Sequence, residues 1–281
     1  MTAVSTLDRK ADRLRQILAS RSHLIVAYSG GVDSAFLAWM AHQVLGTEMR
    51  AVIADSASLA RTHLEDALAF AREHKIPVKV VETQELENPA YVRNDAQRCF
   101  HCKDELFTVL ERYREAAGFD AIAYGVNADD EGDFRPGQQA ARQHHVLAPL
   151  LEAGLNKAEI RELARQAGLR VWDKPASACL SSRLEYGREV TPEALSVIEQ
   201  GEDALRALGF RQFRVRHHGD IVRIEIAREE LPQALTTEMA RKFTALFKTL
   251  GFKFVTLDLE GFRSGSMNRL LPPEELLRGR S

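Results

Sequence analysis

Three cysteines carry the most distinctive chemistry in this sequence of 281 residues. Cys99 and Cys102 form a C-x-x-C pair, and Cys179 stands alone in the later segment DKPASACLSSR. An odd number of cysteines without an export signal does not indicate a disulfide framework, so metal binding and thiol chemistry are the informative alternatives. Inert buried thiols are the ordinary alternative for all three.

A second candidate for chemistry is the hexapeptide SGGVDS, which joins two apolar runs. LIVAY before it is typical of a strand buried on both faces, and FLAWMAHQVL after it predicts an amphipathic helix. Paired glycines let backbone N–H groups converge on a phosphate, and the positive end of the helix and two hydroxyls add attraction. A Gly-Gly turn alone more often serves only to connect a strand to a helix. The serines on both sides and the aspartate within this turn favour a phosphate loop. Its predicted binding residues are Ser29, Gly30, Gly31, Asp33 and Ser34.

Polar residues also follow two other predicted strands. Asp55 ends the strand AVIAD, where it either meets the ribose or adenine of a nucleotide or caps the next helix. Asn127 follows the strand AIAYG, and the acidic residues beyond it either hold Mg²⁺ on a triphosphate or cap a helix. The rest of this cluster consists of Asp129, Asp130, Asp133 and Arg135.

The elements that must position these residues alternate between strand and helix in the first part of the chain. Apolar runs separated by helices of this length imply crossover connections, and hence an α/β fold whose parallel sheet has helices on both faces. Ligands of such sheets bind at the carboxyl ends of the strands. Asn156, with Glu159 as its capping-box partner, predicts a helix that ends at Gly168.

The pattern changes in the last hundred or so residues. Thr191 and Pro192 predict a helix start, and the alternation in RQFRVRHHGDIVRIEIA predicts a hairpin with one apolar face. A further helix and strand complete a small α+β unit of a size that folds on its own. We therefore expect two domains, 1–180 and 181–281.

Charge and hydropathy limit the class of protein. A formal net charge of −2 is poor support for a nucleic-acid-binding surface, so we expect a small-molecule substrate. The polar N-terminal segment lacks the apolar region of a secretory signal, and no run is long enough to span a bilayer. We expect a cytoplasmic protein without a membrane partner.

SGGVDS resembles the SGGxDS signature of the PP-loop ATP pyrophosphatase superfamily. Longer segments resemble the LarE-type sulfur transferases, which help to build the nickel-pincer cofactor of lactate racemase; they are YGVNADDEGDFRPGQQAA, LAPLLEAGLNKAEIRELARQAGLRVWDKPASACLSSR and GFRSGSMN. The resemblance covers nearly the whole chain. It implies an enzyme that uses ATP to adenylate a carboxylate of a pyridinium mononucleotide, releases AMP and pyrophosphate, and forms a thiocarboxylate. It also implies a homo-oligomer.

The resemblance assigns Cys179 the central role. In family members with a single cysteine, this residue attacks the acyl-adenylate, forms a thioester and gives up its own sulfur, which leaves dehydroalanine. A nucleophile of this kind must be favoured as a thiolate, and Arg183 and Lys174 in the same loop are the cations expected to lower its pKa.

Cys99 and Cys102 depart from the single-cysteine pattern. Together with Cys179 they suggest a [4Fe-4S] cluster with one open iron, similar to the arrangement in PP-loop tRNA thiolases. We favour this cluster over the sacrificial route, because the pair otherwise has no use. Zinc with His101 as an additional ligand is a weaker alternative.

Arginines of the C-terminal part are expected to hold the phosphate of the substrate. Arg214 and Arg216 share the predicted polar face of a strand, and Arg263 lies within the family segment GFRSGSMN. Two alternatives to the sulfur transferase remain open: a PP-loop tRNA thiolase, and a non-catalytic iron–sulfur or nucleotide-binding carrier. The low net charge argues against the first, and the intact phosphate and cysteine loops argue against the second.

Overall fold

The computed structural model describes residues 5–130, 136–175, 178–263, 265 and 267. They fall into two compact units, which are treated separately. Unit 1 takes its residues from Met1–Glu85 and Cys99–Ser177, and unit 2 from Leu86–Arg98 and Ala178–Gly279. Unit 2 therefore includes a short segment from the first half of the chain. The functional division into domains 1–180 and 181–281 stays a prediction.

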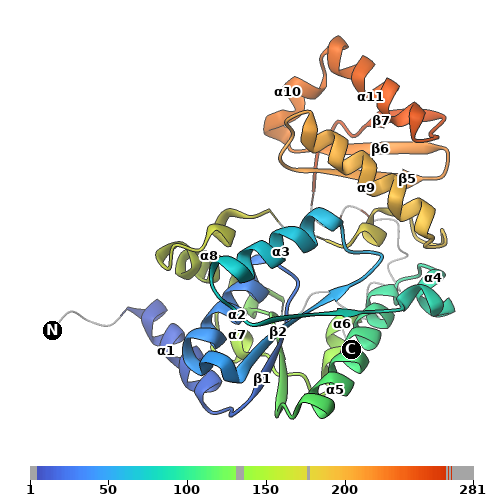
Figure 1. Cartoon of the computed structure of the whole chain (residues 1–281). Coiled ribbons are helices and arrows are strands. Elements are labelled where there is room, and N and C mark those ends of the chain that lie inside the picture. The colour runs from blue at the N-terminus through green and yellow to red at the C-terminus, as the bar shows by residue number, and fades with distance from the viewer. Residues whose placement is uncertain (1–4, 131–135, 176–177, 264, 266, 268–281) are drawn as a thin grey trace. The chain divides into compact units, whose positions relative to one another are not determined.

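Unit 1 contains a four-stranded parallel sheet in the order β3-β2-β1-β4, and Figure 1 labels its strands β1 and β2. This confirms the predicted α/β fold with a parallel sheet. The strands are β1 (Leu24–Ala27), β2 (Met49–Asp55), β3 (Val78–Glu82) and β4 (Ala121–Tyr124). The helices are α1 (Thr6–Ala19), α2 (Val32–Leu45), α3 (Arg61–Glu73), α5 (Arg98–Ala117), α6 (Pro136–Gln143), α7 (Pro149–Glu152) and α8 (Lys157–Gln166).

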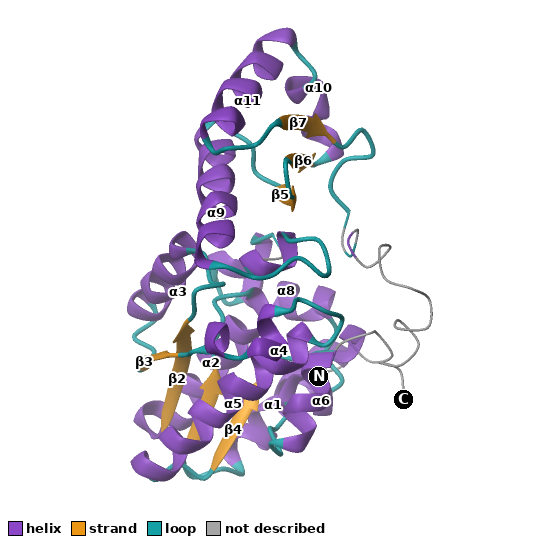
Figure 2. Cartoon of the chain, turned by 90° about the vertical axis from the view of Figure 1, so that its right-hand side faces the viewer, coloured by secondary structure: helices purple, strands orange, loops and turns teal. Residues whose placement is uncertain are grey.

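Helices cover both faces of this sheet (Figure 2). Leu24 and Val26 of β1 face a core shared with α1, α2, α3 and α8, whereas Ile25 and Ala27 face a core shared with α5 and α6. The strand is buried at all its positions, as its apolar run predicted. The amphipathic pattern predicted for α2 is wrong: its buried residues include Phe36, Leu37 and Ala38 in succession, because β1, β2, α1 and α8 all pack on it.

Unit 2 is built on a three-stranded sheet in the order β5-β6-β7. β5 (Phe213–His218) and β6 (Ile221–Ile226) are antiparallel, which confirms the predicted hairpin, and β7 (Phe254–Leu257) lies parallel to β6. The helices of the unit are α4 (Pro89–Val92), α9 (Pro192–Ala207), α10 (Leu231–Ala234) and α11 (Thr237–Thr249).

Two helix starts were predicted from their caps, and both are confirmed. Asn156 and Glu159 form a reciprocal capping box at the start of α8. The Thr191 hydroxyl accepts a hydrogen bond from the Ala194 N–H at the start of α9, and Pro192 occupies the first turn. Capping therefore fixes where these helices begin.

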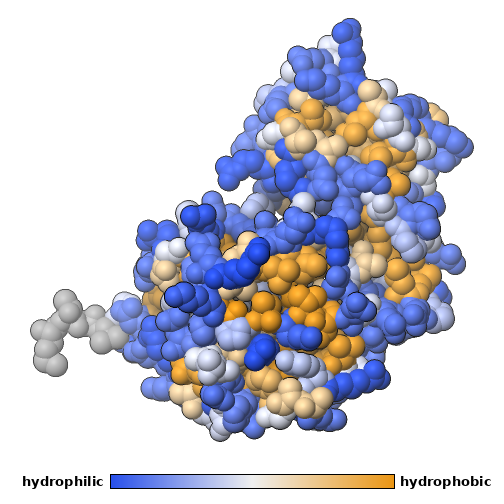
Figure 3. Space-filling view, viewed as in Figure 1, coloured by the Kyte–Doolittle hydropathy of each residue, from blue (hydrophilic) through white to orange (hydrophobic). Residues whose placement is uncertain are grey.

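Hydrophilic residues cover most of the visible surface, and hydrophobic residues gather over the middle of unit 1 (Figure 3). Val80 on the edge strand β3 is among the exposed large apolar side chains, at 36% exposure. In the described part of the chain, no helix combines the length and the apolar character that crossing a membrane requires.

Candidate functional site

The SGGVDS loop connects the carboxyl end of β1 to the start of α2. Gly31 is the N-cap of α2, and no described side chain forms a capping bond there, so the first N–H groups of the helix have no side-chain cap among the described residues. The Ser29 and Ser34 hydroxyls lie 3.0 Å apart, and the Ser34 hydroxyl also accepts a hydrogen bond from the Ser29 N–H. The loop thus brings two hydroxyls and the positive end of a helix together, which suits an oxyanion.

Two glycines are required where the backbone approaches this loop. Gly30 has a φ of +71°, and a Cβ there would come within 2.6 Å of the Ala67 Cβ. A Cβ at Gly125, which follows β4, would come within 2.8 Å of the Ser34 nitrogen. Since β4 and β2 lie on opposite sides of β1, the loop sits at the point where the strand order reverses, the usual ligand site of such sheets.

Asp33 is partnered by a residue that the sequence reasoning did not single out. The Lys157 ammonium forms an ion pair with Asp33 Oδ2. Burial raises the pKa of Asp33, and Lys157 opposes that effect. Asp33 Oδ1 is buried and makes no hydrogen bond within the described part of the chain. Lys157 brings a cation to a phosphate loop that, unlike a Walker motif, has no lysine of its own. It lies 124 positions from Asp33 in the sequence, so no local pattern pointed to it.

The polar residues after β4 form hydrogen bonds largely with one another. Asn127 Oδ1 accepts a hydrogen bond from the Asp129 N–H, and Asp130 Oδ2 accepts one from the Asn127 N–H. Asp129 Oδ2 accepts one from the Lys157 N–H at the start of α8, so Asp129 contacts a helix start, while a role in Mg²⁺ binding stays a prediction. Asp130 interacts electrostatically with Asp33, which places two carboxylates beside the phosphate loop. The remaining predicted members, Asp133 and Arg135, lie outside the described residues.

Asp55 ends β2, next to β1, and lies at the same edge of the sheet as the phosphate loop. It does not cap α3, whose N-cap is Ala60. Its carboxylate instead pairs with Arg61 at 2.5 Å, and both side chains are well exposed. A role for Asp55 at the ribose or adenine stays a prediction.

Cys179 precedes a short 3-10 turn, Leu180–Arg183, in unit 2. The Arg183 guanidinium is 1% exposed and donates from Nη1 to the carbonyl oxygens of Ala178 and Cys179, at 2.8 and 2.9 Å. Its Nε and Nη2 form a bidentate pair with Glu202 of α9 at 2.8 and 3.1 Å. This buried pair anchors the cysteine loop to α9.

The Cys179 thiol lies in an electropositive setting. Burial raises its pKa, but Arg98, the Ser181 hydroxyl and Arg183 outweigh burial and lower the pKa below the ordinary thiol value. The Ser181 oxygen lies 3.2 Å from the sulfur. Arg183 was predicted, whereas Arg98 was missed because it lies far away in the sequence. Lys174 is not among these causes, and its ammonium pairs with Asp66 in unit 1.

The face of the hairpin that carries Arg214 and Arg216 was predicted from its alternation to be polar, and in the structure it is buried. Arg214 and Arg216 are 9% and 6% exposed. Arg216 pairs with Glu225 at 2.8 Å and donates to the Ser182 carbonyl, while Arg214 lies over the Phe262 ring with its guanidinium carbon 4.8 Å from the centroid. The loops 178–183 and 258–263 thus provide partners for a face that alternation alone marks as polar.

Positive charge is concentrated on this covered face. Burial and the charge of Arg183 lower the pKa of Arg214 to about 10. Arg263 pairs with Asp258 at 3.3 Å, while its buried Nε makes no hydrogen bond to any residue that the structure describes. Carboxylates balance part of this charge, because Arg183 pairs with Glu202, Arg216 with Glu225, and Arg263 also with Glu260.

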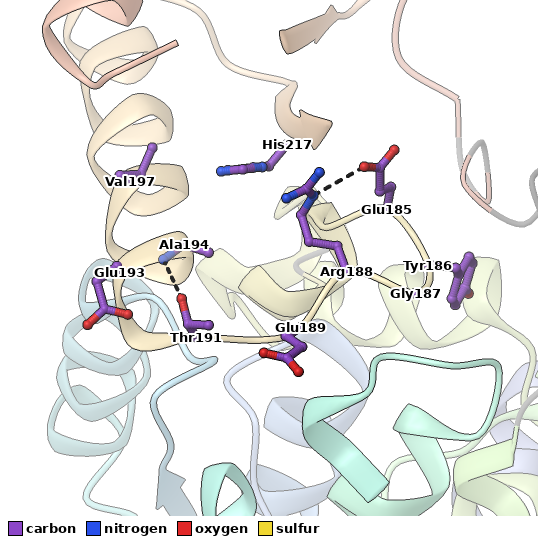
Figure 4. A pocket seen from close by; sticks show the side chains of 10 residues that line it. All are labelled: Glu185, Tyr186, Gly187, Arg188, Glu189, Thr191, Glu193, Ala194, Val197 and His217. Carbon is purple, nitrogen blue, oxygen red and sulfur yellow. Dashed lines mark hydrogen bonds and ion pairs between the residues drawn. The ribbon is translucent and has the colours of Figure 1, made fainter. Parts of the chain in front are cut away.

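A pocket of about 750 Å³ lies entirely within unit 2, between the turn after the cysteine loop and the start of α9. Figure 4 shows the Arg188 guanidinium between Glu185 and the His217 ring. Burial and Arg188 lower the pKa of His217, whereas His218 and Arg188 overcome burial and lower that of Glu185. The sequence did not reveal this pocket because a turn, a helix start and a strand each contribute to it.

Cys99 and Cys102 lie in the first turn of α5, at a spacing that puts them on one side of the helix. Cys99 is exposed and Cys102 is partly exposed. Among the described residues, no three His, Cys, Asp or Glu side chains form a group that could hold a metal ion. Cys99 and Cys102 belong to unit 1 and Cys179 to unit 2, so the predicted cluster stays a prediction.

Known proteins match this chain along most of its length. A family model described as NAD synthase matches residues 7–109. An uncharacterised protein of Synechocystis sp. is 42% identical over 94% of this chain and 99% of its own. An uncharacterised protein of Methanocaldococcus jannaschii is 29% identical over 86% of this chain and 91% of its own.

A relative with a described activity gives the decisive match. The pyridinium-3,5-bisthiocarboxylic acid mononucleotide synthase of Lactiplantibacillus plantarum is 33% identical over 97% of this chain and 99% of its own length. The match spans the phosphate loop, the cysteine loop and the arginine-bearing hairpin together. The chain therefore belongs to the LarE-type synthase family, within the PP-loop ATP pyrophosphatases, and is an ATP-dependent enzyme.

Proposed function

We propose that the protein is a sulfur transferase that adenylates a carboxylate of a pyridinium mononucleotide and converts it to a thiocarboxylate for a nickel-pincer cofactor. The full-length match to a synthase named for such a mononucleotide carries this proposal. That relative also weakens the tRNA thiolase alternative, since it is named for the synthesis of a mononucleotide. An ATP-dependent enzyme excludes the non-catalytic carrier.

Adenylation is the step proposed for the phosphate loop. A carboxylate oxygen of the substrate attacks the α-phosphorus of ATP, the bond to the β-phosphate oxygen breaks, and pyrophosphate leaves with its electron pair. The N–H groups and hydroxyls between Ser29 and Ser34 hold the departing pyrophosphate, with Lys157 adding positive charge. Mg²⁺ that accompanies ATP would find carboxylate oxygens at Asp33 and Asp130.

Sulfur transfer is the step proposed for Cys179. In the sacrificial route, its thiolate attacks the acyl-adenylate carbonyl carbon, AMP leaves, and a thioester forms. A base then removes the Cys179 α-proton while the Cβ–S bond breaks, which releases the thiocarboxylate and leaves dehydroalanine. Arg98 and Arg183 favour the thiolate that begins this sequence.

The three-cysteine cluster remains a prediction. When bound, a [4Fe-4S] cluster with one open iron would supply a place for exogenous hydrosulfide. The two routes differ in their effect on the protein: the sacrificial route removes one H₂S from the chain, and the cluster route leaves its mass unchanged.

The substrate phosphate is proposed to bind at the buried arginines of unit 2. Three buried arginines of the hairpin and cysteine loop, Arg183, Arg214 and Arg216, accompany the buried Glu202 and Glu225. Arg263 adds a guanidinium with an unpaired Nε among the described residues. A homo-oligomer, in which subunits share this site, is part of the same proposal and is tested by mass measurement in solution.

The proposal is tested by mixing the protein with ATP, Mg²⁺ and a carboxylated pyridinium mononucleotide. We expect AMP, pyrophosphate and a thiocarboxylate, with ATP–pyrophosphate exchange that requires the mononucleotide. Exchange supported by tRNA and not by the mononucleotide would transfer the assignment to the thiolase alternative. Absence of exchange with any of these substrates would reject the proposed adenylation.

A further inference from the structure

The segment Leu86–Arg98 is an insertion from the first half of the chain into unit 2. Its neighbours on both sides, up to Glu85 and from Cys99, belong to unit 1. The segment contains α4 and a short turn that ends in Arg98, the first residue of α5. Apart from α4, it is not a regular element of the C-terminal fold, so the contacts it makes there need an explanation.

Asn94 holds the loop that follows Cys179. It is fully buried, has a φ of +55°, and donates from Nδ2 to the carbonyl oxygens of Glu185 and Arg188 at 2.8 and 2.9 Å. The Asn94 carbonyl accepts a hydrogen bond from the Gly187 N–H. Asparagine is among the few residues that tolerate this left-handed backbone. Both the backbone conformation at position 94 and the two hydrogen bonds of its side chain therefore favour asparagine there.

Arg98 reaches the cysteine loop itself. It is 4% exposed, and its Nη1 donates to the Asn94 side-chain oxygen and, at 2.9 Å, to the Ser181 carbonyl. The Ser181 hydroxyl lies 3.2 Å from the Cys179 sulfur. The guanidinium carbon also lies 5.8 Å from the centroid of the Tyr186 ring. Asn94 and Arg98 therefore grip the chain between residues 181 and 188 at several points.

Packing alone does not account for these contacts. A buried guanidinium is costly unless its charge and its donors are used, and an apolar side chain would fill the same space more cheaply. Arg98 instead donates to the Ser181 carbonyl, and Asn94 donates to two further backbone carbonyls of the same loop, the loop that carries Cys179. Hydrogen bonds to its backbone carbonyls hold a loop in one conformation. A loop held in this way presents its thiol to a reactive carbon in a single geometry.

We propose that Asn94 and Arg98 are positioning residues for the sulfur-transfer step, acting by holding the loop from Cys179 to Arg188 in one conformation. This inference rests on the proposed function, in which Cys179 takes part in sulfur transfer. The inference makes the segment 86–98 part of the site of sulfur transfer. In the sequence, this segment lies between two parts of unit 1, which carries the phosphate loop. Adenylation should not depend on these two residues.

The test uses full-length Arg98→Met, Arg98→Lys and Asn94→Ala, with Arg93→Met as the matched control from the same segment, since the Arg93 side chain is 65% exposed. Two steps are measured: ATP–pyrophosphate exchange with the mononucleotide, and thiocarboxylate formed in a single turnover. We expect exchange within about twofold of wild type, and thiocarboxylate formation slower by about 100-fold in Arg98→Met and Asn94→Ala. Arg98→Lys should recover part of that loss, and Arg93→Met should match wild type.

Hydrogen exchange of the amides between Cys179 and Arg188 gives a readout that needs neither ATP nor substrate. We expect it to be about tenfold faster in Arg98→Met and Asn94→Ala than in wild type or Arg93→Met. Wild-type amide exchange in both variants, or equal losses in both chemical steps, would overturn this inference alone. A wild-type protein that performs neither step would instead overturn the proposed function.

Discussion

The phosphate loop and the cysteine loop are assembled in opposite ways. The phosphate loop consists of consecutive residues whose backbone and hydroxyls do the binding, and two glycines permit close contacts. The cysteine loop is held by buried side chains from elsewhere in the chain, namely Asn94, Arg98 and Glu202, the last through its pair with Arg183 of the loop. The first should therefore respond to substitutions that change backbone shape, and the second to substitutions that remove charge or hydrogen bonds.

The largest effect is expected at Cys179. Cys179→Ala should reduce thiocarboxylate formation by at least about 1000-fold, because no other group at that position supplies a nucleophile or holds sulfur. ATP–pyrophosphate exchange, measured with the same protein, should stay within a few-fold of wild type. Equal loss of both activities would mean that the two loops do not act in separate steps.

Gly30→Ala tests the backbone argument for the phosphate loop. The new methyl group would meet Ala67, and the φ of +71° is strained for alanine, so exchange should fall by about 100-fold. Gly168→Ala is the matched control, because its φ is +72° but no atom lies within 4 Å of a Cβ there. If both variants lose exchange alike, backbone strain rather than the shape of the loop is responsible.

Removing one partner of the buried Arg183–Glu202 pair tests the side-chain argument. Glu202→Gln leaves the Arg183 charge without its counter-ion, and the free energy of unfolding should fall by about 3 kcal/mol. Urea denaturation followed in unit 2 measures this loss. Glu238→Gln is the control, since its pair with Lys242 is exposed and should contribute little. If the Glu202→Gln protein is as stable as the control, the Arg183–Glu202 pair does not anchor the cysteine loop.

The same pair makes unit 2 sensitive to acid. Burial raises the pKa of Glu202, but Arg183 outweighs it and holds the pKa below that of the unfolded chain. The stabilisation is therefore complete above the unfolded value of about 4.3 and disappears as the pH falls through the lower folded value. Urea midpoints of wild type and Glu202→Gln should converge on acidification. If the urea midpoints of the two proteins instead stay equally far apart as the pH falls, the Arg183–Glu202 pair is not the source of the acid sensitivity.

Asp55 should show the smallest effect. Its pair with Arg61 is exposed, so Asp55→Asn should change the free energy of unfolding by less than about 1 kcal/mol. If Asp55 meets the ribose or adenine, the KM for ATP should rise a few-fold while kcat is retained. An unchanged KM would leave Asp55 as a surface ion pair.

Sequence reasoning was most successful where function depends on neighbouring residues. The SGGVDS turn, the α8 capping box, the Thr191 N-cap and the β5–β6 hairpin were predicted because each is encoded within a few positions. Lys157, Arg98 and Asn94 were missed because tertiary structure alone brings them to their loops. The same limit applies to Arg214 and Arg216, whose burial was not predicted, since alternation does not reveal the segments that cover a sheet.

One measurement tests the central claim most directly: thiocarboxylate formation and intact protein mass after reaction with ATP and the carboxylated mononucleotide, for wild type and Cys179→Ala. The account predicts thiocarboxylate from wild type and none from the variant, while both still release pyrophosphate. A loss of one H₂S from wild type would identify Cys179 as the sulfur source, and unchanged mass with repeated turnover on added sulfide would support the cluster. Thiocarboxylate from Cys179→Ala at the wild-type rate would contradict the account.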